Sequence, residues 1–408
     1  MNIWVLNPYD QTPDQQSTRT YEYAKRLVER GHEVTVFSSS FSHYKFVEEK
    51  LAPGQNWKIE FFDKIRFIWV KTFPYNKNNW RRAINMLSHA WMAFWAGMTL
   101  NERPDVIMGV SVPIFTGFSA YLLSLFKRAR FFFEVRDLWP QTLVDLGAIS
   151  DRSPFTYVMR MMERLLYAKA EKIISLLPYA HEYIMKQGVS REKVVWLPNG
   201  IDLSQYEVTK KYEGGSPETF TLMYIGGFAS YHGIEVILEA AKRLEIKYGR
   251  FLKFVLIGDG PERSRMIRLA HDMRLENVEF RGLSPKREIP IALGEADACI
   301  AVIKKINVLK YGINPNKLFD YFASGRPIIF AINSINNPVA DAQAGISVPA
   351  EDPEALSQAI IKLLNMERHA RKEMGDNGLR YLSKHFDINM LADKLETIFL
   401  GGDCSKMI

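Results

Sequence analysis

The chain has 408 residues, of which 47% are hydrophobic and 24% are charged, and it carries a formal net charge of +7 at pH 7. This composition excludes a disordered chain, and the length predicts two domains of roughly 200 residues each. Two cysteines, Cys299 and Cys404, exclude a disulfide framework, and neither a signal-like start nor an apolar run of about 18 residues is present, so we expect a cytoplasmic protein.

Short apolar runs alternate with helical patterns through the first half, which is typical of a parallel sheet with helices on both faces. The predicted strands span residues 2–6, 33–38, 65–70, 106–110, 131–135, 172–175 and 194–197. The predicted helices span residues 15–29, 80–100, 114–125 and 153–168. Residues 198–217 contain the run PNGID and two adjacent glycines, and they predict an inter-domain linker.

The same alternation resumes after the linker. The predicted strands span residues 220–225, 253–257, 278–281, 298–302 and 327–331. The predicted helices span residues 233–248, 263–273, 286–296, 316–323, 354–364 and 390–400. The chain therefore reads as two similar α/β halves.

Glycines follow three successive predicted strands of the second half, where helix N-termini of such sheets offer N–H groups to phosphate. These strand-end residues are Gly226, Gly227, Gly258, Gly260 and Gly282. The pattern favours nucleotide binding, although such glycines can also simply end strands. The third glycine of the dinucleotide fingerprint and the P-loop pattern are both missing, which disfavours dehydrogenases and P-loop NTPases.

A predicted helix start in the second half adds side chains to this edge. Asn314 and Asn316 precede and open the helix, Lys317 suits a diphosphate, and Asp320 lies one turn further, where a carboxylate can hold two ribose hydroxyls. His232 follows the first glycine pair. It could contact phosphate, or it could lie at a helix start without a binding role. No H-E-x-x-H, D-x-D or C-x-x-C pattern occurs, so we expect no metal site.

Arg136 and Asp137 stand at the end of a predicted buried strand in the first half. Such a pair either faces a cleft or forms a structural salt bridge. In a cleft, Asp137 could orient or deprotonate an acceptor hydroxyl, and Arg136 could stabilise phosphate charge. Polar residues after the first strand lie at the same predicted edge: Asn7, Tyr9, Asp10 and Gln15.

The segment 58–136 is basic and carries Trp80, Trp91, Phe94 and Trp95. A basic, aromatic surface can meet an anionic membrane or a nucleic acid. It can also be a solvated face above ordinary core aromatics. We favour the membrane surface and expect no nucleic acid.

Five motifs occur in order: PNGID at 198–202, YIGG at 224–227, GDGP at 258–261, PNKLFDY at 315–321 and ASGRP at 323–327. This series resembles glycosyltransferase family 4, whose members are retaining, metal-independent enzymes of the GT-B fold. EVRDLWP at 134–140 further resembles the WbuB-like branch that builds bacterial O-antigen and capsule polysaccharides.

The resemblance implies two Rossmann-like α/β domains facing a central cleft. Residues 1–200 would bind the acceptor and residues 201–385 the nucleotide sugar, while a C-terminal helix within 386–408 packs back toward the N-terminal domain. The implied reaction moves a sugar, such as an N-acetylated amino or deoxyamino sugar, from UDP to a polyprenyl-diphosphate-linked saccharide, with no cofactor. The enzyme would then lie peripherally on the inner face of the bacterial cytoplasmic membrane.

The resemblance carries over unevenly to single residues. Asp320 matches the second member of an acidic pair that holds the ribose, but the first member falls at Gly312. The diphosphate-binding arginine and lysine of the family fall near Gly227 and His232, so contact would shift to Lys317, His232 and helix N–H groups. The acceptor-side histidine falls at Arg136, which leaves Asp137 as the nearest candidate base.

Further departures leave other functions open. The family's glycine-rich loop after the first strand is replaced here by residues 13–17. The leaving diphosphate itself could accept the acceptor's proton in a front-face attack, and Asp137 would then not be required as a base. A sugar-nucleotide epimerase of the same architecture and a catalytically inactive assembly subunit remain alternatives.

Overall fold

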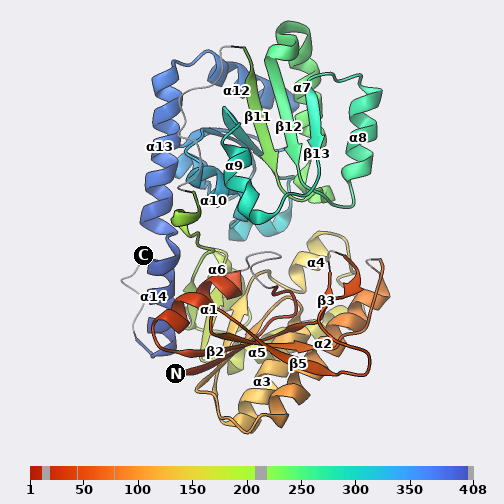
Figure 1. The fold of residues 1–408 in the computed structure, drawn as a ribbon, viewed down its shortest axis with the longest axis vertical. Coiled ribbons are helices and arrows are strands. Elements are labelled where there is room, and N and C mark those ends of the chain that lie inside the picture. Colours follow the sequence, from red (N-terminus) through yellow and green to blue (C-terminus); the bar gives the residue numbers. More distant parts are fainter. Residues whose placement is uncertain (12–18, 44, 78, 207–217, 403–408) are drawn as a thin grey trace. The chain divides into compact units, whose positions relative to one another are not determined.

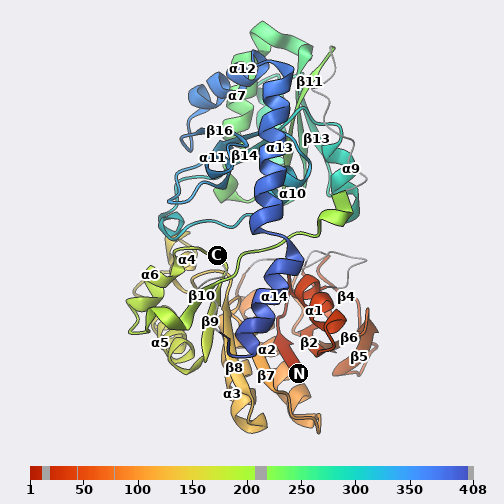
Figure 2. The same cartoon turned by 90° about the vertical axis from the view of Figure 1, so that its left-hand side faces the viewer.

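The computed structural model describes residues 1–11, 19–43, 45–77, 79–206 and 218–402. These residues form two compact units. Unit 1 combines Met1–Asn199 with Ile388–Ile408, and unit 2 consists of Gly200–Asp387. Each unit is built around its own sheet, as Figures 1 and 2 show from two directions.

Unit 1 contains an eight-stranded sheet in the order β10-β9-β8-β7-β1-β2-β6-β5. Its strands are β1 (Asn2–Leu6), β2 (Glu33–Ser39), β5 (Trp57–Phe62), β6 (Ile65–Val70), β7 (Val106–Val110), β8 (Arg130–Val135), β9 (Lys172–Ser175) and β10 (Val194–Trp196). The predicted parallel sheet is confirmed, because every neighbouring pair except β5 with β6 is parallel. The short strands β3 (Phe41–Ser42) and β4 (Val47–Glu48) pair separately.

The β5–β6 hairpin is the part of this sheet that the sequence pattern did not predict. Its two strands are joined by Asp63 and Lys64, which both have positive φ, at 46° and 63°. Two such residues form the tight turn whose twist matches that of a hairpin. Asp-Lys lacks the glycine that usually announces this turn, and β5 (WKIEFF) alternates apolar and charged residues, so it has no continuous apolar run.

Helices cover both faces of the unit 1 sheet. They are α1 (Arg19–Glu29), α2 (Trp80–Thr99), α3 (Ile114–Lys127), α4 (Gln141–Asp145), α5 (Pro154–Lys169), α6 (Ala180–Met185) and α14 (Ile388–Phe399), with the 3-10 turn η1 (Arg191–Lys193). Met108 of β7 packs in one core with α1 and α14. The next residue, Gly109, lies against Ala120 of α3. Successive strand residues point to opposite faces, so α3 covers the other side.

The α14 helix is part of unit 1 although it ends the described chain. Figure 2 shows it beside α1, and Leu391 and Phe399 are buried in the core that they share. The Phe399 ring lies 5.0 Å from that of Phe132 on β8, and Arg30 Nε donates to Asp393 Oδ1 at 2.9 Å. Apolar burial and edge ion pairs together fix this helix to the sheet.

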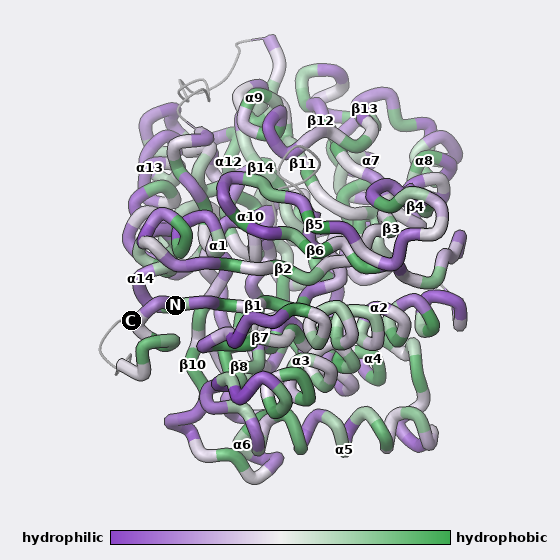
Figure 3. Tube along the Cα trace, turned by 60° about the horizontal axis from the view of Figure 1, so that its bottom comes forward, coloured by the Kyte–Doolittle hydropathy of each residue, from purple (hydrophilic) through white to green (hydrophobic). Residues whose placement is uncertain are grey.

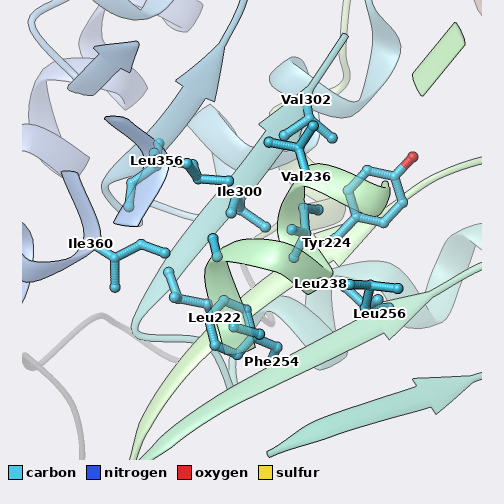
Figure 4. Close-up of a cluster of buried hydrophobic side chains, with 14 of the residues drawn as sticks. Leu222, Tyr224, Val236, Leu238, Phe254, Leu256, Ile300, Val302, Leu356 and Ile360 are labelled. Carbon is cyan, nitrogen blue, oxygen red and sulfur yellow. The ribbon is translucent and has the colours of Figure 1, made fainter. Parts of the chain in front are cut away.

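Unit 2 contains a six-stranded, wholly parallel sheet in the order β13-β12-β11-β14-β15-β16. Its strands are β11 (Phe220–Ile225), β12 (Leu252–Ile257), β13 (Val278–Arg281), β14 (Ala298–Val302), β15 (Ile328–Ala331) and β16 (Gly345–Val348). Figure 4 shows the core, in which Leu222, Phe254 and Ile300 of the sheet meet Val236, Leu356 and Ile360 of two helices.

The helices of unit 2 are α7 (Glu235–Tyr248), α8 (Arg263–Asp272), α9 (Ile289–Leu293), α10 (Asn316–Ala323), α11 (Pro338–Asp341), α12 (Pro353–Leu364) and α13 (Arg368–His385). Short 3-10 turns are η2 (Leu203–Tyr206), η3 (Ser230–His232), η4 (Gly249–Phe251), η5 (Lys286–Glu288) and η6 (Asn307–Tyr311). The predicted helix 286–296 is shorter than expected, because Pro290 stands in the first turn of α9 and η5 precedes it. Cys299 is fully buried.

Candidate functional site

Glycine loops at the carboxyl edge of the unit 2 sheet lie against each other closely. Gly258 has φ +140°, and a Cβ added to it would come within 2.0 Å of the Gly226 carbonyl oxygen. Gly260 has φ +152°, and its Cβ would lie 2.7 Å from the Phe228 nitrogen. Both positions therefore require glycine to pack the loops after β11 and β12. Gly282, after β13, faces open space instead.

Lys317 is anchored to the loop after β11. Its Nζ donates to the Tyr224 hydroxyl at 2.9 Å and lies 4.3 Å from the centre of that ring. The Tyr224 hydroxyl donates in turn to the Gly227 carbonyl oxygen at 2.7 Å. In Figure 4 this hydroxyl points away from the labelled apolar side chains, so the ring belongs to the core and its oxygen to the edge. Desolvation lowers the pKa of Lys317 to about 7.

His232 lies beside the same loop. A Cβ on Gly227 would meet the His232 ring at 3.4 Å, and the Ala229 N–H donates to His232 Nδ1 at 3.4 Å. Burial, aided by the charge of Lys317, lowers the pKa of His232 to about 3. The imidazole is therefore neutral, and an accepting Nδ1 places its proton on Nε2, where it can serve as a donor but not as a charge.

The N-terminus of α10 supplies further donors. Its N-cap is Pro315, which makes no side-chain cap bond, and the Leu318 N–H of the first turn donates to the Pro315 carbonyl oxygen at 3.0 Å. The Asn314 side-chain nitrogen just before it is buried and has no hydrogen-bond partner among the residues that the structure describes, while Asn316 is exposed. The unused Asn314 amide, the Lys317 ammonium group and the positive end of the α10 dipole together suit an anion.

Asp320 is nearly buried, with 6% of its surface exposed. Its Oδ1 accepts hydrogen bonds from the Tyr206 hydroxyl of η2 and the Lys286 ammonium group of η5. Neither partner was predicted, because both lie far from Asp320 in sequence. The predicted residues Gly226, Gly227, His232, Lys317 and Asp320 thus come from one edge of unit 2, and Lys286 and Tyr206 join them.

At the end of β8 in unit 1, Arg136 is paired with Glu134 rather than with Asp137. Glu134 Oε2 accepts from Arg136 Nε at 2.7 Å, and its Oε1 accepts from Arg19 Nε at 2.7 Å. Burial alone would raise the pKa of Glu134, but the two arginines outweigh it and hold the pKa at about 2. Glu134 and Arg136 are two positions apart at the end of a strand, a spacing that puts both side chains on one face. This spacing could have predicted the pair.

Asp137 is exposed, and its backbone oxygen accepts from the Ser111 hydroxyl at 3.0 Å. Asn7 holds the loop after β1, since its Oδ1 accepts from the Tyr9 N–H at 3.2 Å. Asp10 is buried and its carbonyl oxygen accepts from Ser38. Gln15 and the replaced loop 13–17 fall outside the described residues.

The aromatic residues of α2 are exposed, so the interpretation as ordinary core is wrong for the tryptophans. Trp80, Trp91 and Trp95 are 67%, 62% and 45% exposed. Phe94 joins them to Phe126 of α3, with ring centres 5.7 Å apart. Neither helix contains an acidic residue, and Figure 3 shows many hydrophobic residues along both.

Within the described ranges of the chain, no helix combines the length and the apolar character that a bilayer-spanning segment needs. No group of three or more His, Cys, Asp or Glu side chains in the same ranges is arranged to hold a metal ion.

Comparison with known proteins adds two family matches. Residues 16–200 match the family "Glycosyl transferase 4-like domain", and residues 219–366 match "Glycosyl transferases group 1". WcaI of Escherichia coli K12, assigned by name to glycosyl transfer in colanic acid biosynthesis, is 22% identical over 369 residues, covering 86% of this chain and 88% of WcaI.

Solved structures share the fold at low identity. Sucrose-phosphate synthase from Thermosynechococcus elongatus has a TM-score of 0.77 at 17% identity, covering 98% of both chains. HepE of Anabaena, solved with UDP-glucose, has a TM-score of 0.68 at 13% identity, covering 98% of this chain and all of HepE. The predicted α/β fold with two Rossmann-like domains is therefore confirmed.

Proposed function

The chain belongs to family 4 of the GT-B glycosyltransferases, and on this premise we propose that it moves a sugar from UDP to a polyprenyl-diphosphate-linked saccharide. The observation that carries the proposal is the meeting of Lys317, the N-terminus of α10 and the loop after β11 at one sheet edge. HepE, which shares the fold, was solved with UDP and with UDP-glucose.

The donor diphosphate lies at the Lys317 end of this edge. Lys317 contributes an ammonium group, His232 an Nε2–H donor, and α10 the positive end of its helix dipole. These groups stabilise the charge that develops on the leaving UDP, and no metal is needed for that purpose. Asp320, one turn along the helix, takes the ribose.

The transfer retains the anomeric configuration through front-face attack. The acceptor oxygen bonds to the anomeric carbon as the bond from that carbon to the diphosphate oxygen breaks, and the hydroxyl proton passes to the departing diphosphate oxygen. Asp137 orients the acceptor hydroxyl from unit 1. Arg136, held by Glu134, keeps the neighbouring backbone in place and adds positive charge.

The acceptor places the enzyme at a lipid surface. The exposed tryptophans of α2 form an acid-free face with Phe126 and with Arg81 at its start, which suits the inner, anionic leaflet of the bacterial cytoplasmic membrane. WcaI and an O-antigen chain mannosyltransferase of Escherichia coli support a role in surface-polysaccharide synthesis. We also propose that the chain belongs to the WbuB-like branch and that the sugar it transfers is an N-acetylated amino or deoxyamino sugar.

A radiochemical transfer assay tests the function. Purified protein, UDP-sugars and short polyprenyl-diphosphate saccharides should give a lipid-linked product with the anomeric configuration of the donor, and Lys317→Met should reduce the rate at least tenfold. Conversion of a UDP-sugar to its isomer in the absence of an acceptor would support the epimerase instead. Absence of UDP release with every donor and acceptor would support an inactive subunit.

A further inference from the structure

Strand β5 is an outer edge of the unit 1 sheet, and no described residue hydrogen-bonds the backbone groups on its outward flank. It pairs with β6 alone among the described strands, and Figure 3 shows the two side by side. On the β6 side, the Lys71 N–H donates to the Asn56 carbonyl oxygen at 2.8 Å. Backbone groups of successive strand residues point to opposite flanks, so the N–H and C=O groups that face outward are those of Trp57, Ile59 and Phe61.

This edge lacks most of the features that keep an edge strand from pairing. Proteins protect such edges with proline, bulges or charged side chains. The six residues of β5 include no proline and pair with β6 in unbroken register, and the three outward-bonding residues are apolar. Their side chains lie on one face of the sheet and are exposed, with Trp57 at 37%, Ile59 at 43% and Phe61 at 66%. The edge is therefore open to another strand.

The sequence of β5 complements itself when two copies run antiparallel with Ile59 opposite Ile59. Lys58 then lies opposite Glu60 of the other copy, and Trp57 lies opposite its Phe61. Opposite charges and aromatic rings placed directly across two strands stabilise the pair. The three outward-bonding residues also meet each other in this register, and each such pair exchanges two hydrogen bonds, about six in all.

Neighbouring registers lose this complementarity. A shift of two residues places Glu60 opposite Glu60 or Lys58 opposite Lys58, and like charges directly across two strands are destabilising. A shift of one residue places the outward-bonding residues opposite residues that already bond β6. The sequence therefore specifies one register, which is centred on Ile59.

We propose that this chain forms a twofold-symmetric dimer through β5, which joins two unit 1 sheets edge to edge. A second copy rather than a lipid surface occupies the edge, because lipid tails cannot hydrogen-bond the outward backbone groups. Each copy contributes six strand residues, which is a small interface, so the dissociation constant should be in the micromolar range. This contact is independent of the proposed transfer reaction.

Sedimentation equilibrium of the full chain at concentrations from about 1 to about 100 μM tests the dimer. The average mass should rise from that of one chain toward that of two chains across this range. Ile59→Pro removes an outward N–H without taking a bond from β6. This variant should stay monomeric, while its circular dichroism spectrum and thermal unfolding stay close to those of the wild type. A wild type that remains monomeric at the highest concentration would overturn the proposal.

Exchanged charges test the register without relying on proline. Lys58→Glu and Glu60→Lys should each weaken self-association at least about fivefold, because both variants set like charges opposite each other. An equimolar mixture of the two variants should dimerise about as well as the wild type, since each charge then faces its opposite. Lys372→Glu is the matched control, because Lys372 is an exposed lysine in an ion pair of unit 2, and it should leave the dimer unchanged.

Three further results would count against this dimer. Self-association that neither Ile59→Pro nor the charge variants alter would show that another surface forms it. A mixture of the charge variants that associates no better than its two components would overturn the register centred on Ile59. A monomeric wild type whose sedimentation with phosphatidylglycerol vesicles falls in Phe61→Ser would assign this face to a lipid surface instead.

Discussion

The lowered pKa of Lys317 predicts that nucleotide-sugar affinity depends on pH. Burial against Tyr224 holds this pKa at about 7 in the free protein. A bound diphosphate brings negative charge to the ammonium group and raises the pKa back toward its ordinary value. Binding therefore takes up a proton above pH 7, and affinity falls as pH rises through 7.

The magnitude follows from the protonated fraction. Below pH 6 Lys317 is charged and the affinity is constant, whereas at pH 9 only about one molecule in 100 is charged, so affinity falls about 100-fold, or ~2.7 kcal/mol. A UDP-sugar should be used, because its diphosphate does not titrate in this range. Calorimetry in two buffers of different ionisation enthalpy should show uptake of about half a proton at pH 7.

Two variants separate Lys317 from other titrating groups. Lys317→Arg keeps its charge throughout, because a guanidinium does not titrate in proteins, and its affinity should be flat from pH 6 to 9. Lys317→Met should bind the UDP-sugar weakly, with an affinity that does not change from pH 6 to 9. A wild-type affinity that is constant over this range, with no proton uptake, would falsify the assignment of Lys317 to the diphosphate.

Three further predictions concern stability and membrane binding. Buried Glu163 accepts from two tyrosine hydroxyls and has a pKa raised to about 7 by burial, so it destabilises the fold as pH rises through 7. Glu163→Gln should therefore add about 2–3 kcal/mol at pH 8 but little at pH 5 in urea denaturation, and an equal effect at both pH values would contradict this. Gly258→Ala should cost at least ~2 kcal/mol in the same assay, whereas Gly282→Ala in open space should cost under about 0.5 kcal/mol; similar losses would argue against the loop packing. Replacing Trp91 and Trp95 by serine should reduce sedimentation with phosphatidylglycerol vesicles severalfold, while the same change at exposed Ile246 should not, and unchanged sedimentation would exclude α2 as the membrane face.

The buried strands could be predicted from the sequence almost to the residue. Those of β1, β6, β7, β9, β11 and β14 match the expected ranges, because strands buried on both faces read as continuous apolar runs. The β5 strand is mostly exposed and gives no such run. The α13 helix was also missed, since its polar sequence buries only Gly375, Gly378 and Leu382.

The candidate site could be predicted only where its residues are local in sequence. Lys317 and Asp320 lie one helical turn apart, so spacing alone places them together. The contacts of Asp320 with Lys286 and Tyr206 depend on how η5 and η2 pack around α10. No local sequence pattern predicts that packing. Arg136 was found, but its partner Glu134 was missed because the adjacent Asp137 suggested a different pair.

The position of α14 in unit 1 has a consequence for biosynthesis. A ribosome releases Ile388–Phe399 only after all of unit 2 has been made, so until then the apolar surface of unit 1 that α14 covers beside α1 stays exposed. Unit 2 is one continuous segment of the chain, so it can fold first. A stop codon shortly before Ile388 would thus harm the part of the protein translated earliest.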